Sequence, residues 1–372
     1  MSALQAVTAS PRPGSPAAFV RLARVKFLFQ SMMVTGFGVG LSVYTTGAFS
    51  APWYVLTLAF AWSTHLMTHF CNEYFDLEAD RANPRPTAWT GGSRVLVDGL
   101  LTPATSIGAA FVLLFVSMAL IAAMPTLFAR LLACALTALA WFYTAPPLRL
   151  NYRALGEVSC AAVLYGMGPL LAAHLQAGRF SALLLWSTAL VTALQVLRCL
   201  IMNLADIEGD TLVGKRTLAC VVGPRRLAHV YAVGQTGLYL GVVLLASVGA
   251  LPPPVALAQL VVAPVGLFVA RSLLTGAMDD PGRRGDVTFW SSMQLPLTTC
   301  STMVAALAEM MRQGRPVPPA WLAIAGLTTA LFLLWLQRTA AARPRERPGV
   351  PFPTVRTGEG PATAYHPRGR KR

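Results

Sequence analysis

Charged residues are scarce in this sequence, and acidic residues are the scarcest of them. Asp and Glu number 15 among 372 residues, and all charged residues make up 12% of the chain. That share is about half of what an ordinary soluble domain carries. Hydrophobic residues make up 55% of the chain. The composition therefore excludes an ordinary water-soluble domain and indicates a protein whose partner is the lipid bilayer.

Signatures of zinc, disulfide and nucleotide sites are also missing. The six cysteines form no CxxC pair and most lie in apolar runs, so we interpret them as small interior residues. Residues 209–215 fit the pattern GxxxxGK, but Arg216 follows where a P-loop has Ser or Thr. An apolar run also precedes this stretch, where a P-loop has a strand. The sequence therefore predicts none of these three sites.

Basic residues outnumber acidic residues, and the formal net charge is +15. Nucleic-acid binding would be one reason for such a charge, but the distribution of the charge argues against it. Nine Lys and Arg residues lie in residues 338–372, and most of the others lie in short loops between apolar runs. This pattern is typical of membrane topology, so we expect no nucleic-acid partner.

Ten apolar runs approach the ~20 residues that a helix needs to cross about 30 Å of hydrocarbon. With ten spans, 26 of the 30 Lys and Arg residues fall on one side of the membrane and four on the other. Because positively charged loops stay in the cytoplasm, both termini are expected on the cytoplasmic side. The runs are Phe27–Phe49, Trp53–Cys71, Thr105–Ala123, Leu127–Tyr143, Gly156–Leu175, Leu183–Met202, Leu227–Ala250, Val255–Leu274, Phe289–Ala308 and Trp321–Leu336.

Seven of the 15 acidic residues lie in two short windows, Glu73–Asp80 and Asp206–Asp210. Each window directly follows an apolar run, and in each a helix would carry three oxygen-bearing side chains on one face. These side chains are Asn72, Asp76 and Asp80 in the first window, and Asn203, Asp206 and Asp210 in the second. The other acidic residues of the windows, Glu73, Glu78 and Glu208, are expected to point elsewhere.

Four apolar runs separate the two windows, so both return to the same side of the membrane and can meet at one mouth. Converging carboxylates repel each other unless cations lie between them. Mg²⁺ prefers carboxylate and amide oxygens and keeps coordination sites open for phosphate. Basic side chains for a phosphate ligand lie around the same mouth. They are Arg81, Arg94, Arg149, Lys215 and Arg216. Acids, bases and an apolar interior together predict an isoprenyl diphosphate as the ligand.

Three stretches resemble the UbiA superfamily of intramembrane prenyltransferases. NEYFDLEAD at residues 72–80 looks like its first aspartate-rich motif, and NLADIEGDTLVGKRTLA at residues 203–219 looks like its second. YTAPPLRLNYRALGE at residues 143–157 resembles the cytoplasmic loop between them. The resemblance covers residues 21–308 and implies an all-α bundle of nine transmembrane helices around a central cavity, with the tenth span as an extra helix.

The resemblance divides the chain into four parts. A disordered N-terminal segment (1–20) precedes a UbiA-like transmembrane domain (21–310), which is followed by an extra transmembrane helix (311–338). A disordered basic tail (339–372) ends the chain. The protein is expected in the inner membrane of a bacterium or an organellar membrane of a eukaryote, with its active site on the cytoplasmic side.

The resemblance also implies the chemistry. Each motif would hold one Mg²⁺ through its Asn and two Asp residues, both ions would bridge the diphosphate, and the basic residues would neutralise the leaving group. An aromatic acceptor would then attack the allylic carbocation, with the ring of Tyr143 facing that cation. His65 and His69, spaced i, i+4, are expected to shape the acceptor pocket and not to bind a metal.

The motifs look closest to the branch that prenylates 1,4-dihydroxy-2-naphthoate in menaquinone synthesis. TGGSRVLVDG at residues 90–99 departs from that branch, which more often has a Gly-Pro stretch there. Two alternatives remain open. A terpene cyclase of the same fold would use the diphosphate site without an aromatic acceptor, and a secondary transporter could use intramembrane acids as an ion pathway.

Overall fold

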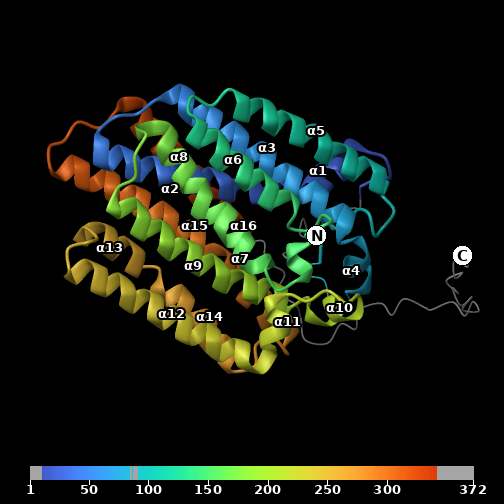
Figure 1. Ribbon diagram of the computed structural model, residues 1–372. Helices are drawn as coiled ribbons and strands as arrows, with labels where there is room; N and C mark the ends of the chain where they lie inside the picture. Colours follow the sequence, from blue (N-terminus) through green and yellow to red (C-terminus); the bar gives the residue numbers. More distant parts are fainter. Residues whose placement is uncertain (1–10, 84–85, 87–90, 342–372) are drawn as a thin grey trace, which may run out of the picture.

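The computed structural model describes residues 11–83, 86 and 91–341 (Figure 1), and this part of the chain is helical, with no β-strand. The expected all-α fold is confirmed. The long helices are α2 (Leu28–Thr46), α3 (Ala51–Phe75), α5 (Pro103–Ala122), α6 (Leu127–Trp141), α9 (Ala182–Leu204), α12 (Pro224–Ser247), α15 (Pro281–Arg312) and α16 (Pro319–Ala341). Two further crossings are each built from consecutive pieces: α7 (Gly156–Ala161), η3 (Ala162–Met167) and α8 (Gly168–Ala177), then α13 (Pro253–Leu260) and α14 (Ala263–Leu274).

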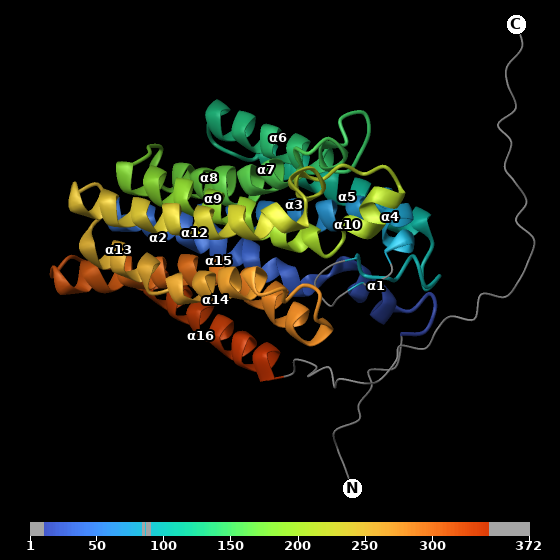
Figure 2. The same cartoon turned by 90° about the horizontal axis from the view of Figure 1, so that it is seen from below.

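The long helices run side by side, and short helices gather at one end of the bundle (Figures 1 and 2). These short elements are α1 (Pro16–Ala23), η1 (Val25–Phe27), α4 (Leu77–Ala82), η2 (Leu150–Tyr152), α10 (Ile207–Leu212) and α11 (Leu218–Val222). Helix α2 is largely buried and packs against α3, α8, α9, α15 and α16. The bundle therefore has an inner helix, and the helices around it present their other faces outward.

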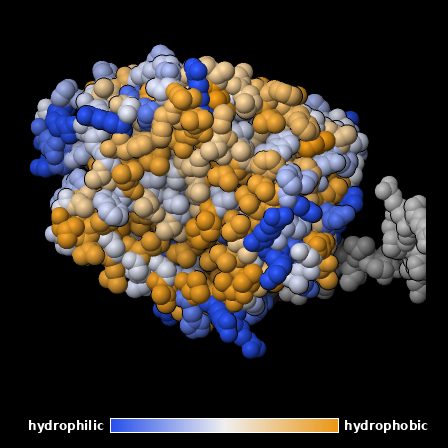
Figure 3. Space-filling view, viewed as in Figure 1, coloured by the Kyte–Doolittle hydropathy of each residue, from blue (hydrophilic) through white to orange (hydrophobic). Residues whose placement is uncertain are grey.

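Hydrophobic residues cover much of the face of the bundle seen in Figure 3, with hydrophilic residues between and beside them. Phe115 on α5, Val233 and Leu240 on α12, and Leu327 on α16 each expose more than 60% of their surface. Apolar patches this extensive do not stay in contact with water, and they suit contact with lipid chains. The high hydrophobic content of the chain thus includes apolar side chains on the outside of the bundle.

Each of the ten predicted spans coincides with one of these helices or helix groups, but only seven described segments are both long and apolar enough to cross a membrane. Helix α6, with 15 residues, is too short to meet this criterion. Helices α3 and α15 are long enough but are not apolar enough. On α3 and α15, Ser, Thr, Gln and His side chains face neighbouring helices, and these buried polar groups lower the mean hydropathy. The seven apolar segments are the evidence that the chain crosses the membrane several times.

The predicted N-terminal boundary was wrong. Residues 16–20 were expected to be disordered, but they begin α1, where the Ser15 side chain accepts a hydrogen bond from the Ala18 backbone amide and caps the helix. Leu22 of this helix is fully buried. Residues 1–10 and 342–372, on which most of the two expected disordered ends fall, lie outside the described residues. Helix α16 (Pro319–Ala341) covers most of residues 311–338, the stretch that we expect to hold the extra transmembrane helix.

Candidate functional site

Both acidic motifs have the same local structure: a long helix, a one- or two-residue break, and a six-residue helix. Helix α3 ends at Phe75, Asp76 has non-helical backbone angles (φ −95°, ψ 6°), and α4 begins at Leu77. Helix α9 ends at Leu204, and α10 begins after Asp206. The expectation of one continuous helix face in each window was therefore wrong. The break turns each chain segment across the end of the bundle.

The two short helices α4 and α10 pack against each other, which brings the motifs together. The Asn83 side-chain amide donates a 2.7 Å hydrogen bond to Oδ1 of Asp206. Gly209 permits this approach, because a Cβ atom at that position would lie only 2.8 Å from the Asn83 Cα atom. The residue that follows α4 thus positions a carboxylate of the second motif.

A cavity of about 270 Å³ opens between the motifs and continues into the bundle. Its polar end contains most of the predicted ligand side chains, namely Asn72, Asp76, Asp80, Asn203 and Asp206, together with Lys215. Its inner wall is largely apolar and includes Phe60, Leu136, Leu139, Val163 and Leu171. Tyr143, His65 and His69 also line it. The cavity therefore joins a charged mouth to an apolar interior.

Lys215 joins the two motifs electrostatically. Its Nζ atom lies 3.5 Å from Oδ2 of Asp76 and 3.2 Å from Oδ1 of Asp210. A backbone hydrogen bond also joins two of these residues, since the Lys215 amide donates to the Asp210 carbonyl. Asn151, from η2, donates from its side-chain amide to both carboxylate oxygens of Asp76 at 3.2 and 3.3 Å. Asp210 is therefore part of the site through Lys215, although it does not itself line the cavity.

The two asparagines of the motifs are also held from other elements. Thr144 donates to the side-chain oxygen of Asn72 at 2.8 Å. The side-chain amide of Asn203 donates to Glu157 at 2.8 Å, and the same Glu157 oxygen accepts from the Ala219 backbone amide at 3.1 Å. Glu157 is fully buried at the start of α7. The predicted loop 143–157 therefore contributes positioning residues that the motif spacing did not identify.

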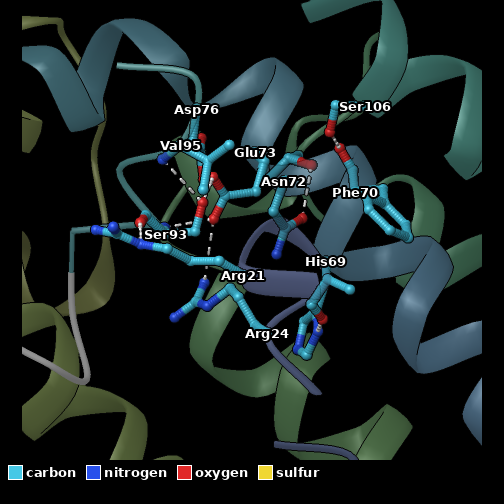
Figure 4. A network of polar contacts seen from close by, with 12 residues as sticks. Arg21, Arg24, His69, Phe70, Asn72, Glu73, Asp76, Ser93, Val95 and Ser106 are labelled. Carbon is cyan, nitrogen blue, oxygen red and sulfur yellow. Dashed lines mark hydrogen bonds and ion pairs between the residues drawn. The ribbon is translucent and has the colours of Figure 1, made fainter. Parts of the chain in front are cut away.

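Glu73 lies at the site, contrary to the expectation that it points elsewhere. It lines the cavity, accepts from the amide and hydroxyl of Ser93 at 2.6 Å each, and lies 3.8 Å from Nη1 of Arg24 (Figure 4). These contacts fasten the loop at Ser93 to α3. In the same loop Gly92 has φ +73°, and a Cβ atom there would collide with the Asp80 carboxylate. Glycine thus lets the loop cover Asp80.

The two histidines have ordinary hydrogen-bond partners. Nδ1 of His65 lies 2.7 Å from the Ser31 hydroxyl, and Nδ1 of His69 lies 2.8 Å from the Ala23 carbonyl. Their ring centroids are 4.4 Å apart. Both rings therefore shape the cavity wall.

The predicted basic residues are only partly at the cavity. Of the five, Lys215 alone lines it. Arg81 and Arg216 are exposed, Arg94 donates to the backbone carbonyl of Asp80, and Arg149 stacks on Tyr152 with its Cζ atom 3.8 Å from the ring centroid. Two other arginines line the cavity, Arg24 before α2 and Arg198 on α9. Arg24 lies far in sequence from both acidic windows, and Arg198 lies inside the apolar run that precedes the second window, so neither was among the predicted site residues.

Burial and neighbouring charges shift the pKa values of the ionisable side chains at the mouth of the cavity. Burial, reinforced by the charges of Glu73 and Asp76, raises the pKa of Asp80 to about 8. Burial also raises the pKa of Asp210 to about 6, against the opposing effect of the Lys215 ammonium. For Lys215, burial lowers the pKa, but the carboxylates of Asp76, Asp210 and Asp206 outweigh this effect and raise it overall. At pH 7 the Asp80 carboxyl is therefore mostly protonated, and it must lose that proton to bind a cation.

The donor chemistry of the mouth fits a hard divalent cation. Carboxylate and amide oxygens are the ligands that Mg²⁺ prefers, and Oδ2 of Asp210 is buried without a hydrogen-bond partner. Within the described part of the chain, no three His, Cys, Asp or Glu side chains already form a metal-binding group. The Lys215 ammonium lies between two of the carboxylates, so a cation at this place would require that side chain to move.

Solved structures resemble this fold. A UbiA homologue from Aeropyrum pernix K1 matches with a TM-score of 0.56 and 18% identity, covering 78% of this chain and 98% of the homologue. A homologue from Archaeoglobus fulgidus, determined with GPP and Mg²⁺, matches with a TM-score of 0.52 and 16% identity, covering 77% and 99%. The same homologue with DMAPP and Mg²⁺ gives 0.51 and 17%, covering 87% and 99%.

The sequence comparisons give a family and no individual relative. No curated protein matches the chain. The family model described as the UbiA prenyltransferase family matches residues 31–293, which begin in α2, include both motifs and end within α15, before α16. The chain belongs to the UbiA prenyltransferase family.

Proposed function

We propose that this protein transfers an isoprenyl group from an isoprenyl diphosphate to an aromatic acceptor, with Mg²⁺ as cofactor, within the membrane. One observation carries the proposal: the two acidic motifs meet at the charged mouth of a cavity whose interior is apolar. The homologue structures determined with GPP or DMAPP and Mg²⁺ support the substrate class and the metal. Quinone synthesis, including menaquinone synthesis, is the pathway class we propose.

The diphosphate would be bound at the mouth. Asn72, Asp76 and Asp80 would hold one Mg²⁺, and Asn203, Asp206 and Asp210 a second. When bound, Mg²⁺ supplies positive charge that stabilises the departing pyrophosphate. Lys215 would donate to the diphosphate once its ammonium leaves Asp76 and Asp210, and Arg24 lies close enough to the mouth to assist.

The isoprenyl chain would lie along the apolar wall of the cavity. Cleavage of its C–O bond leaves an allylic carbocation, which water would quench, so a wall of Phe and Leu side chains protects it. The ring of Tyr143 lines the cavity near the mouth and would stabilise the positive charge. The acceptor would lie against His65 and His69. Its attacking ring carbon would then lose a proton, or lose its carboxylate group as CO₂, and the ring would become aromatic again.

The test uses purified protein in lipid nanodiscs with labelled geranyl diphosphate, Mg²⁺ and a panel of naphthoate, hydroxybenzoate and homogentisate acceptors. Products are identified by mass. Acceptor-dependent prenylation supports the proposal. Pyrophosphate release with a hydrocarbon or alcohol product would indicate a terpene cyclase, and no Mg²⁺-dependent consumption would refute diphosphate chemistry and favour a transporter.

A further inference from the structure

A second pocket, of about 430 Å³, lies between α1 with η1 and the loop at residues 92–94. Four basic side chains line it: Arg21, Arg24, Lys26 and Arg94. We call this pocket the basic vestibule. Helix α1 lies at the same end of the bundle as α4 and α10 (Figure 2). Arg24 and Gly92 line both the vestibule and the cavity.

The vestibule has far more positive than negative charge. No carboxylate is among the described residues that line it. Arg21 donates to the Ser93 carbonyl at 3.3 Å, and Arg94 donates to a backbone carbonyl, so both of these partners are uncharged. Arg24 lies 3.8 Å from the carboxylate of Glu73. The net charge therefore favours an anionic ligand.

The surroundings of these cations indicate what kind of anion would bind. Arg21 and Lys26 are exposed, so a ligand can reach them. Two apolar residues of the same pocket, Val20 and Val25, expose 52% and 47% of their surface. Guanidinium groups bind phosphate oxygens in a bidentate manner, and exposed valines suit a hydrocarbon chain. A molecule with a phosphate group and an apolar chain satisfies both features.

We propose that the basic vestibule binds the phosphate group of such an amphiphile beside the cavity. Two sources share this chemistry: an anionic phospholipid of the membrane, and a free isoprenyl diphosphate outside the cavity. The phospholipid source is independent of the proposed function. The isoprenyl diphosphate source rests on it.

The experiment compares two double variants that remove equal charge. R21Q/K26Q removes two vestibule cations, and R130Q/R179Q removes two exposed arginines that lie outside both pockets. Each protein is reconstituted in phosphatidylcholine nanodiscs, and its binding of inorganic pyrophosphate is measured by calorimetry in EDTA, where no Mg²⁺ is free. In a second arm, native mass spectrometry counts the phosphatidylglycerol molecules retained from mixed vesicles. Thermal unfolding verifies that each variant is folded. If R21Q/K26Q does not fold, the single variant R21Q takes its place.

The vestibule variant is expected to bind pyrophosphate about tenfold more weakly than wild type, or to retain less phosphatidylglycerol, while R130Q/R179Q matches wild type in both arms. A loss in the first arm identifies free diphosphate as the source, and a loss in the second identifies the lipid. Equal values for all three proteins in both arms would overturn the proposal. Asp206→Asn, tested in parallel with Mg²⁺ present, reports separately on the proposed function.

Discussion

Substituting Lys215 tests whether its ammonium holds the two motifs together before any ligand binds. At an effective dielectric constant of about 20, unit charges separated by 3.5 or 3.2 Å attract each other by roughly 5 kcal/mol. Desolvation offsets much of this, and removing one partner of a buried ion pair costs about 3–5 kcal/mol. We expect Lys215→Met to fall near 3 kcal/mol, the lower end of that range, because Asn151 still donates to Asp76 and a carboxylate can take up a proton.

Thermal unfolding in nanodiscs measures this effect directly. In EDTA, Lys215→Met should unfold several degrees below wild type, and saturating Mg²⁺ should recover most of the difference. Lys215→Arg keeps the charge and should lose less stability, while Arg216→Met removes the neighbouring exposed charge and should not change the melting temperature. Equal melting temperatures for Lys215→Met and wild type in EDTA would refute the reasoning.

Three further predictions concern the mouth of the cavity. Asp206→Asn should lower turnover of an isoprenyl diphosphate by at least about 100-fold while the protein stays folded, and near-normal turnover would contradict the metal assignment. At pH 7, Mg²⁺ binding should release about one proton, because Asp80, with its pKa raised to about 8, must ionise to bind the ion. Binding heats measured in buffers of different ionisation enthalpy detect that proton, and Mg²⁺ affinity should fall as the pH falls below about 8. Gly209→Ala should destabilise the protein by about 1–3 kcal/mol, since its Cβ atom would collide with Asn83, whereas Gly237→Ala, which has open space, should not; equal melting temperatures would contradict this.

The positions of the helices could be predicted because each apolar run is bounded by loop residues, and a helix is the structure that satisfies its backbone in lipid. The grouping of Asp76 and Asp206 at one mouth could be predicted for a related reason, since an even number of crossings returns the chain to the same side. The breaks at these residues could not, because the spacings i, i+4, i+8 and i, i+3, i+7 fit a continuous helix as well as an interrupted one.

The remaining site residues depend on contacts between distant segments. Arg24 reaches the cavity because α1 folds back on α3, and Glu73 faces it because Ser93 and Arg24 hold it there. The exposure of Arg81 and Arg216 is the opposite case: both are next to a motif in sequence, but their helix or loop turns them outward. Neither outcome has a local sequence signal.

The central claim is that the two motifs form one Mg²⁺-dependent site for an isoprenyl diphosphate. The most direct test is the Mg²⁺-dependent consumption of labelled geranyl diphosphate by the purified wild type, Asp76→Asn and Asp206→Asn, with and without aromatic acceptors. We predict consumption by the wild type that requires Mg²⁺, yields a prenylated acceptor, and is lost in both variants. Consumption that persists in either folded variant, or that does not require Mg²⁺, would contradict the account.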